Sequence, residues 1–109
     1  MTEPRMTEPR MVVSDLVRSE VQSRFPNDAA TVVEQLAVTP LPFLDAPDRT
    51  RERDRVHLAI IKVSGGDTAK LPHILDRAAM DWRDVLVWSG LGNVDWPDVL
   101  RAAGLPVPE

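Results

Sequence analysis

The chain has 109 residues, a formal net charge of −4 and no cysteine, so we expect one domain with its own core and exclude disulfides, thiol nucleophiles and zinc-ribbon motifs. The negative charge disfavours nucleic acid as a partner. No apolar run approaches the roughly 18 residues of a membrane span, and together with the missing cysteines this predicts a cytoplasmic protein that does not enter a membrane.

The chain begins with the pentapeptide MTEPR written twice. These residues are polar, contain proline and show no hydrophobic periodicity, so they cannot bury much apolar surface. We therefore expect a disordered tail over residues 1–11 and a single helical domain over residues 12–109.

Two stretches with apolar residues at helical spacing follow the tail. The first, over 14–24, has Ser14 in place for an N-cap, and Phe25 with the proline after it marks its end. The second, over 29–37, follows Asp28, which is predicted to cap it. The sequence thus indicates two short helices before the first proline-rich segment.

Two further helical stretches lie in the middle of the chain. The stronger one covers 49–64 and ends at Gly65, which is placed for a left-handed C-cap. The next follows Asp67 and carries an apolar stripe that ends near Ala79. No segment alternates with period two, so we predict an all-α compact bundle of five to six short helices.

The segment VTPLPFLDAP, residues 38–47, contains three prolines, which forbid a regular helix. It also carries Leu41, Phe43 and Leu44, and a loop this apolar is predicted to lie across the core. A proline-rich docking segment is the alternative, although no complete PxxP motif is present.

The segment DRTRERDR, residues 48–55, holds four arginines interleaved with acidic residues. Spacings such as Asp48 with Arg51 and Glu52 with Arg55 predict a solvent-exposed face of ion pairs. The alternative is that these arginines contact phosphate in a small helix-turn-helix regulator of transcription.

Two similar segments end the chain, DWRDVLVWSGLG from Asp81 and DWPDVLRAAGLP from Asp95. The first Asp of each is predicted to be an N-cap. The second, Asp84 or Asp98, is predicted to face the positive end of the helix dipole and to reach back to the cap N–H. The Gly-Leu pair in each copy matches a Schellman C-cap, so the last two helices are predicted to be short and capped by a repeated DWxDVLxxxGL.

The alternative interpretation of the repeat is a metal-dependent enzyme in which Asp81, Asp84, Asp95 and Asp98 converge on Mg²⁺ or Ca²⁺. Carboxylates that cap helices point at backbone N–H groups and not at an ion. The capping interpretation is therefore preferred, and no metal or other cofactor is expected.

Candidates for acid–base catalysis are limited to two histidines. His57 flanks the buried line of its helix and is predicted to be exposed or partly satisfied at the surface. His73 and Asp76 are spaced so that the carboxylate can orient the imidazole for proton transfer, but no Ser, Cys or Lys beside them resembles a nucleophile. The sequence therefore favours a protein without catalytic activity.

Three tryptophans occur in a chain that has no tyrosine and two phenylalanines. Trp82 is predicted on the buried side of its helix, whereas Trp88 turns away from that side, so one tryptophan is expected to be partly exposed. Large aromatic side chains at a rim are common binding anchors. Trp82, Trp88 and Trp96 are therefore the candidate partner-binding residues.

The stretch GGDTAKLPHILDRAAMDWRDVLVWSGL, within residues 56–91, resembles the ending of small uncharacterised bacterial helical proteins, in which a helix closes on Gly-Asp and the chain continues to D-W-R-D-V-L. The resemblance implies a bacterial cytoplasmic protein and assigns no activity or site. Pro72 departs from the helix-forming residue expected at its position, which leaves the start of that helix open.

These features together predict a non-catalytic protein–protein interaction or regulatory module. Its expected partner is another protein or a second copy of the chain in a homodimer, and the sequence assigns no small-molecule ligand. The helix-turn-helix regulator is the first alternative and the aspartate-cluster enzyme the second.

Overall fold

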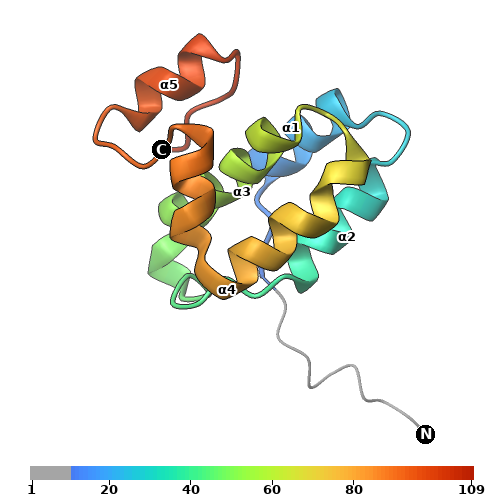
Figure 1. The fold of residues 1–109 in the computed structure, drawn as a ribbon, viewed down its shortest axis with the longest axis horizontal. Coiled ribbons are helices and arrows are strands. Elements are labelled where there is room, and N and C mark those ends of the chain that lie inside the picture. The colour runs from blue at the N-terminus through green and yellow to red at the C-terminus, as the bar shows by residue number, and fades with distance from the viewer. Residues whose placement is uncertain (1–10) are drawn as a thin grey trace, which may run out of the picture.

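The computed structural model describes residues 11–109, which form helices and no strand, so the predicted all-α fold class is confirmed. None of these helices is long and apolar enough to cross a membrane. Their arrangement is drawn in Figure 1. The α-helices are α1 (Asp15–Arg24), α2 (Ala29–Val38), α3 (Thr50–Ser64), α4 (Leu71–Ser89) and α5 (Trp96–Ala102).

The predicted N-terminal tail lies outside the described residues except at its last position. Met11 is buried, and its N–H donates to the carbonyl oxygen of Ala37 at 2.7 Å. Val13 is buried as well. Because an apolar side chain and a backbone hydrogen bond tie Met11 to the rest of the fold, Met11 belongs to the packed domain and not to the tail in which it was predicted.

Helices α1 and α2 begin and end close to their predicted positions, and they pack against each other. The hydroxyl oxygen of Ser14 accepts a hydrogen bond from the N–H of Val17 at 3.3 Å, as expected of an N-cap. Asp28 precedes α2, but its carboxylate makes no capping hydrogen bond. Its backbone (φ −129°, ψ 17°) follows the turn after α1 and not the extended conformation of an N-cap, so this part of the prediction is wrong.

Helix α3 is the central helix and packs against both α1 and α4. Every residue from 56 to 61 is buried. A helix that is buried on all sides needs other elements around it, which explains why α3 lies at the middle of the core. It ends at Gly65 with φ 60°, the left-handed C-cap that the sequence predicts.

The charged start of α3 is not the solvent-exposed face of ion pairs that was predicted. Arg53 is buried, and its guanidinium donates to the carbonyl oxygens of Val12 at 3.2 Å, Leu44 at 2.6 Å and Ala46 at 3.2 Å. Arg55 likewise donates to a loop carbonyl oxygen at 3.0 and 2.6 Å. Loop carbonyls that lack a secondary-structure partner still require hydrogen bonds when buried, and the arginines supply them.

Helix α4 is bent at Asp81, whose backbone is extended inside the helix (φ −160°, ψ 95°). The bend divides α4 into a first arm (71–80) and a second arm (82–89), which Figure 1 shows in gold and orange. The carboxylate of Asp81 accepts a hydrogen bond from the N–H of Arg83 at 3.1 Å, so Asp81 caps the second arm as predicted. The two helices predicted here are therefore the arms of one bent helix.

The start of α4 is set by Pro72. Asp67 accepts a hydrogen bond from the N–H of Ala69 at 3.0 Å and caps a 3₁₀ turn, Thr68–Lys70, that precedes α4. Pro72 then falls in the first turn of α4, where its missing N–H leaves no intrahelical bond unmade. The helix thus accommodates the proline without a break.

The two copies of the terminal repeat end alike and begin differently. Gly90 and Gly104 have φ values of 80° and 75°, and the leucine after each glycine donates its N–H to the carbonyl of the leucine five residues earlier, at 2.9 Å in both copies. These are the bonds of the predicted Schellman caps. Asp95, in contrast, makes no capping hydrogen bond, because its backbone (φ −86°, ψ 16°) is that of a turn.

Candidate functional site

The three tryptophans lie in three different environments, and that of Trp96 is structural. Its side chain is only 7% exposed, and the guanidinium carbons of Arg51 and Arg55 lie 4.6 and 4.9 Å from the centre of its ring. Cation–π contacts of this kind hold the start of α5 against α3. Arg55 adds two hydrogen bonds to the carbonyl oxygen of Leu91, just before α5. Trp96 is therefore part of the core and not a surface anchor.

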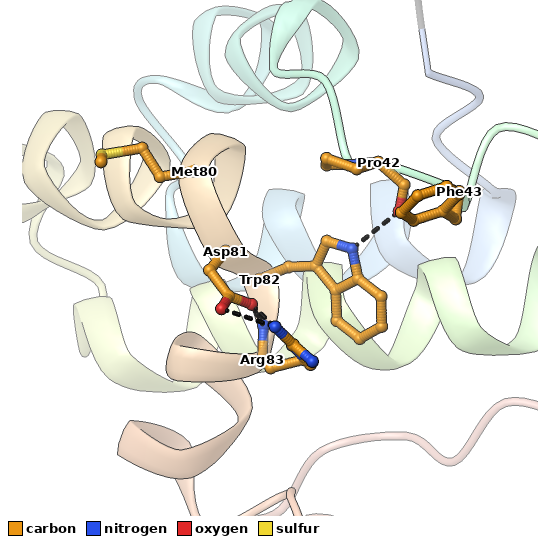
Figure 2. Close-up of a pocket in the computed structure, with 6 residues that line it drawn as sticks. All are labelled: Pro42, Phe43, Met80, Asp81, Trp82 and Arg83. Carbon is orange, nitrogen blue, oxygen red and sulfur yellow. Dashed lines mark hydrogen bonds and ion pairs between the residues drawn. The ribbon is translucent and has the colours of Figure 1, made fainter.

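Trp82 lies beside the bend in α4 and holds the proline-rich loop. Its indole N–H donates to the carbonyl oxygen of Pro42 at 2.8 Å, as Figure 2 shows. Leu41 and Leu44 are buried on either side of this contact, so the loop lies across the core at these two positions as predicted. Trp82 thereby fixes the loop where it passes the bend.

Phe43 is the exception in this loop. The N–H of Leu44 donates to the carbonyl oxygen of Leu41 at 3.0 Å, which closes a tight turn around Pro42 and Phe43. Phe43 has φ 72°, and a proline followed by a positive φ defines a type II turn, in which glycine normally occupies the second place. A non-glycine residue there costs on the order of 1–3 kcal/mol.

The ring of Phe43 is 84% exposed, so its predicted burial is wrong. Leu41 and Leu44 at the two ends of the turn are buried, whereas the Phe43 side chain between them lies at the surface. Figure 2 shows Phe43 next to Pro42 in this turn. The sequence carried one signal of this, the proline at the first central position of the turn. Phe43 was not among the predicted site residues.

A pocket of about 340 Å³ lies between this turn and the bend in α4. It is called the Trp82 pocket below. Met80 on its rim is 72% exposed. Asp81 and Arg83 form a two-point ion pair, with Nε–Oδ1 at 2.9 Å and Nη2–Oδ2 at 3.0 Å. The pocket is lined by Pro42, Phe43, Met80, Asp81, Trp82 and Arg83.

The ion pair makes this pocket electrically balanced. Hydrogen bonding from Arg83 lowers the pKa of the Asp81 carboxyl, and the same contact raises the pKa of Arg83. Both groups therefore stay charged at neutral pH and neutralise each other. The remaining lining is apolar, apart from the backbone.

Trp88 belongs to a second site, which the bend in α4 creates. Its ring stacks on that of His73, with centroids 5.8 Å apart and planes inclined by 15°. In a straight helix two residues 15 positions apart would be separated by about 22 Å, so the two arms must fold toward each other to bring these rings together. The sequence predicts that Trp88 turns away from the buried side, and its side chain is 47% exposed, whereas Trp82 is intermediate and Trp96 is buried.

The two rings form one wall of a groove of about 430 Å³, called the Trp88 groove below. Val63 from α3 and Ile74 from the first arm supply apolar side chains, and Lys70 lies just before α4. Lys70 is exposed and has no ion-pair partner among residues 11–109. An apolar lining, an aromatic wall and one unpaired cation together suit an apolar group that lies next to a carboxylate.

The four aspartates of the repeat are not brought together. Asp81, Asp84 and Asp98 form ion pairs with arginines at 2.9 to 3.4 Å, and Asp95 is exposed. Asp84 and Asp98 thus do not reach back to cap N–H groups, because nearby guanidinium groups compete for their carboxylates. Among residues 11–109 no group of three or more His, Cys, Asp or Glu side chains is arranged to hold a metal ion.

The expectation that His57 lies at the surface is wrong. Its side chain is 1% exposed, and neither ring nitrogen has a hydrogen-bond partner. Burial lowers the pKa of the imidazole to about 3, and the charge of Arg53 acts in the same direction. Asp54 is buried too, and burial raises the pKa of its carboxyl, against a hydrogen bond from Ser14.

Sequence reasoning missed the burial of Asp54 and His57 because it treated the start of α3 as covered on one side only. The residues just before α1 cover the other side, since Val12 accepts a hydrogen bond from Arg53 there. Neither buried group lines the Trp82 pocket or the Trp88 groove. His73 stacks on Trp88 and makes no hydrogen bond or ion pair with Asp76, the partner that the spacing in the sequence allows.

Comparison of the chain with protein-family models, with curated proteins and with solved structures gives no match. The resemblance to small bacterial helical proteins therefore stays a prediction. The two tryptophan sites are the features of the structure from which a function can be inferred.

Proposed function

We propose that the protein is a non-catalytic interaction module that binds a protein partner in the Trp88 groove. The observation that carries this proposal is the stack of Trp88 on His73 at 5.8 Å, beside the unpaired Lys70. A large aromatic side chain at the edge of an apolar groove, itself half exposed, is typical of a binding anchor. The described residues, 11–109, leave Trp88 47% exposed.

The lining of the groove indicates the partner's chemistry. Val63 and Ile74 can bury one large apolar side chain of a partner, and the Trp88 ring can pack against it. Lys70 attracts a carboxylate placed near that side chain. We therefore expect the partner segment to carry Leu, Phe or Trp close to Asp or Glu, as in a helix that lays its apolar face into a groove.

Synthetic peptides test this proposal. We would prepare peptides with Leu, Phe or Trp at the centre and Glu one helical turn away, and a matched set with Lys in place of Glu. Peptides of the Glu set are expected to bind, and the Lys set to bind at least about tenfold more weakly, a difference of about 1.4 kcal/mol. Isothermal titration calorimetry measures both.

Variants of the groove locate the binding. Trp88→Ala and Lys70→Glu are expected to lower the affinity for the Glu peptides at least about tenfold. Val94→Ser is the matched control, because Val94 is 95% exposed and lies outside the groove, so this variant should bind like the wild type. Absence of binding by every Glu peptide, or binding that survives both groove variants unchanged, contradicts the proposal.

Observations on the arginines weigh against the helix-turn-helix alternative. Of the four arginines at 49–55, Arg53 and Arg55 donate to carbonyl oxygens within the fold, and Arg51 lies over the ring of Trp96. Few cations are thus left for phosphate contacts. For the enzyme alternative, the dispersed aspartates offer no metal site. A helical module of this kind suits the bacterial cytoplasm that the sequence resemblance implies.

A further inference from the structure

The Phe43 turn and the Trp82 pocket form a second surface that shares no lining residue with the Trp88 groove. We propose that this surface binds a second copy of the chain. In the resulting two-fold symmetric dimer, Phe43 of each copy enters the Trp82 pocket of the other. This interaction is independent of the partner proposed for the Trp88 groove.

Phe43 is the projecting group. It occupies the place in a type II turn where glycine is favoured, with φ 72°, and its ring is 84% exposed. Within residues 11–109 the ring is mostly exposed and adds little to the core of one copy. A strained and exposed residue of this kind indicates a function outside the fold of one chain.

The Trp82 pocket is a suitable recess for that ring. Its volume is about 340 Å³, and an apolar cavity of roughly 150 Å³ is enough to bind benzene. Met80 and Trp82 supply a thioether and an indole face, both of which pack well against aromatic rings. Figure 2 shows the Trp82 indole between the turn and the bend in α4.

The projecting ring and the recess lie side by side on one surface, since Phe43 itself lines the Trp82 pocket. A two-fold dimer requires a self-complementary patch, in which a group of one copy meets a recess of the other and the reverse. When a two-fold axis lies beside the turn, Phe43 of each copy meets the Trp82 pocket of the other copy. The same residue therefore makes both contacts of the dimer. The surface therefore fits a second copy of the chain without any further element.

The charges of the pocket are compatible with a second copy. Each chain carries a net charge of −4, so two copies repel each other at low ionic strength, and a neutral contact face adds no close-range repulsion to this. Asp81 and Arg83 form an ion pair through two hydrogen bonds of 2.9 and 3.0 Å, which neutralises both charges. An acidic or basic partner finds no unpaired charge in this pocket, whereas a second copy needs none.

Sedimentation equilibrium over a concentration series up to about 1 mM tests the dimer. The wild-type mass is expected to rise from 12.2 kDa toward twice that value. Phe43→Gly removes the ring and suits the turn, so it should weaken the dimer about 30-fold or more. The same variant, at a concentration where the wild type is monomeric, should raise Tm by about 4 °C or more.

A second variant acts on the recess. Met80→Asp places an unpaired charge at the rim of the Trp82 pocket and should also give a monomer, whereas the control Val94→Ser should dimerise like the wild type. A wild-type chain that stays monomeric throughout overturns the proposal. So does a dimer that survives Phe43→Gly and Met80→Asp. Trp88→Ala should leave the dimer intact, which separates this inference from the proposed function.

Discussion

The buried imidazole of His57 predicts that the protein loses stability in mildly acidic solution. The side chain is 1% exposed, its two ring nitrogens have no partner, and burial holds its pKa near 3. In the unfolded chain the same imidazole titrates near 6.5. Between these two pH values the His57 imidazole is protonated in the unfolded chain and neutral in the folded protein.

The sign and the size of the effect follow from this difference. The stability contributed by a neutral His57 is fully present above about pH 6.5 and is lost as the pH falls from there toward 3, at up to about 1.4 kcal/mol per pH unit. At pH 5 the expected loss is about 2 kcal/mol. Asp54 opposes it, because a carboxyl with a raised pKa gains relative stability as the pH falls.

Urea unfolding followed by circular dichroism at pH 7 and pH 5 measures this loss. For a domain of this size about 2 kcal/mol shifts the urea midpoint by roughly 1–2 M. His57→Leu replaces the unpartnered imidazole by an apolar side chain of similar volume, which is close to neutral or stabilising at pH 7. In this variant the extra loss at pH 5 should disappear.

Val94→Ser is the control, because it changes a 95% exposed side chain that carries no titratable group and should keep the pH dependence of the wild type. The reasoning is refuted if the wild type and His57→Leu lose the same free energy of unfolding between pH 7 and pH 5. It is refuted equally if Val94→Ser removes the dependence.

Two further predictions concern the residues that shape the fold. Arg53→Met should lower the free energy of unfolding by about 3 kcal/mol or more, because three loop carbonyls lose their donor; Arg49→Met, at an exposed position, should change it by less than about 0.5 kcal/mol in urea unfolding. Gly90→Ala and Gly104→Ala should each cost about 1 kcal/mol or more, measured in the same way. Their φ values are 80° and 75°, and a Cβ added at either position meets nothing closer than 3.7 Å. If the two variants lose equal free energy of unfolding, backbone strain is the cause, and clearly unequal losses contradict this explanation.

Local signals in the sequence predicted the helices and most of their ends. These signals act within a few residues of the chain, and the structure contains each of them: the apolar periodicity, the Ser14 N-cap, and the glycines after α3 and α4. The break at Asp81 was also predicted, since an N-cap residue sat inside a helical pattern. Its direction was not, because the angle between the arms depends on packing against α3.

Long-range contacts explain what the sequence did not predict. The charged start of α3 resembles a solvent face, yet Arg53 is buried because carbonyl oxygens from the chain before α1 and from the proline-rich loop converge on it. The stack of His73 on Trp88 exists only because α4 folds back. The exposure of Phe43 was not predicted, because a turn with proline at its first central position usually carries glycine next.

The tryptophan at the first position of each repeat copy has a structural explanation. Trp82 holds the proline-rich loop through the carbonyl of Pro42, and Trp96 holds α5 to α3 through two arginines. The repeat is thus a way to dock two short helical segments onto the core. Trp88 has no counterpart in the second copy and is 47% exposed, so it is the tryptophan that the proposed partner would contact.

Indole N–H resonances provide the most direct test of the interaction module. The chain has three tryptophans, so a ¹⁵N-labelled sample gives three such signals, which single Trp→Phe variants assign. On addition of a Glu peptide that binds, the account predicts that the Trp88 signal shifts while the signal of the buried Trp96 stays in place. A Trp88 signal that remains unchanged at saturation, or a response confined to Trp82 or Trp96, would contradict the account.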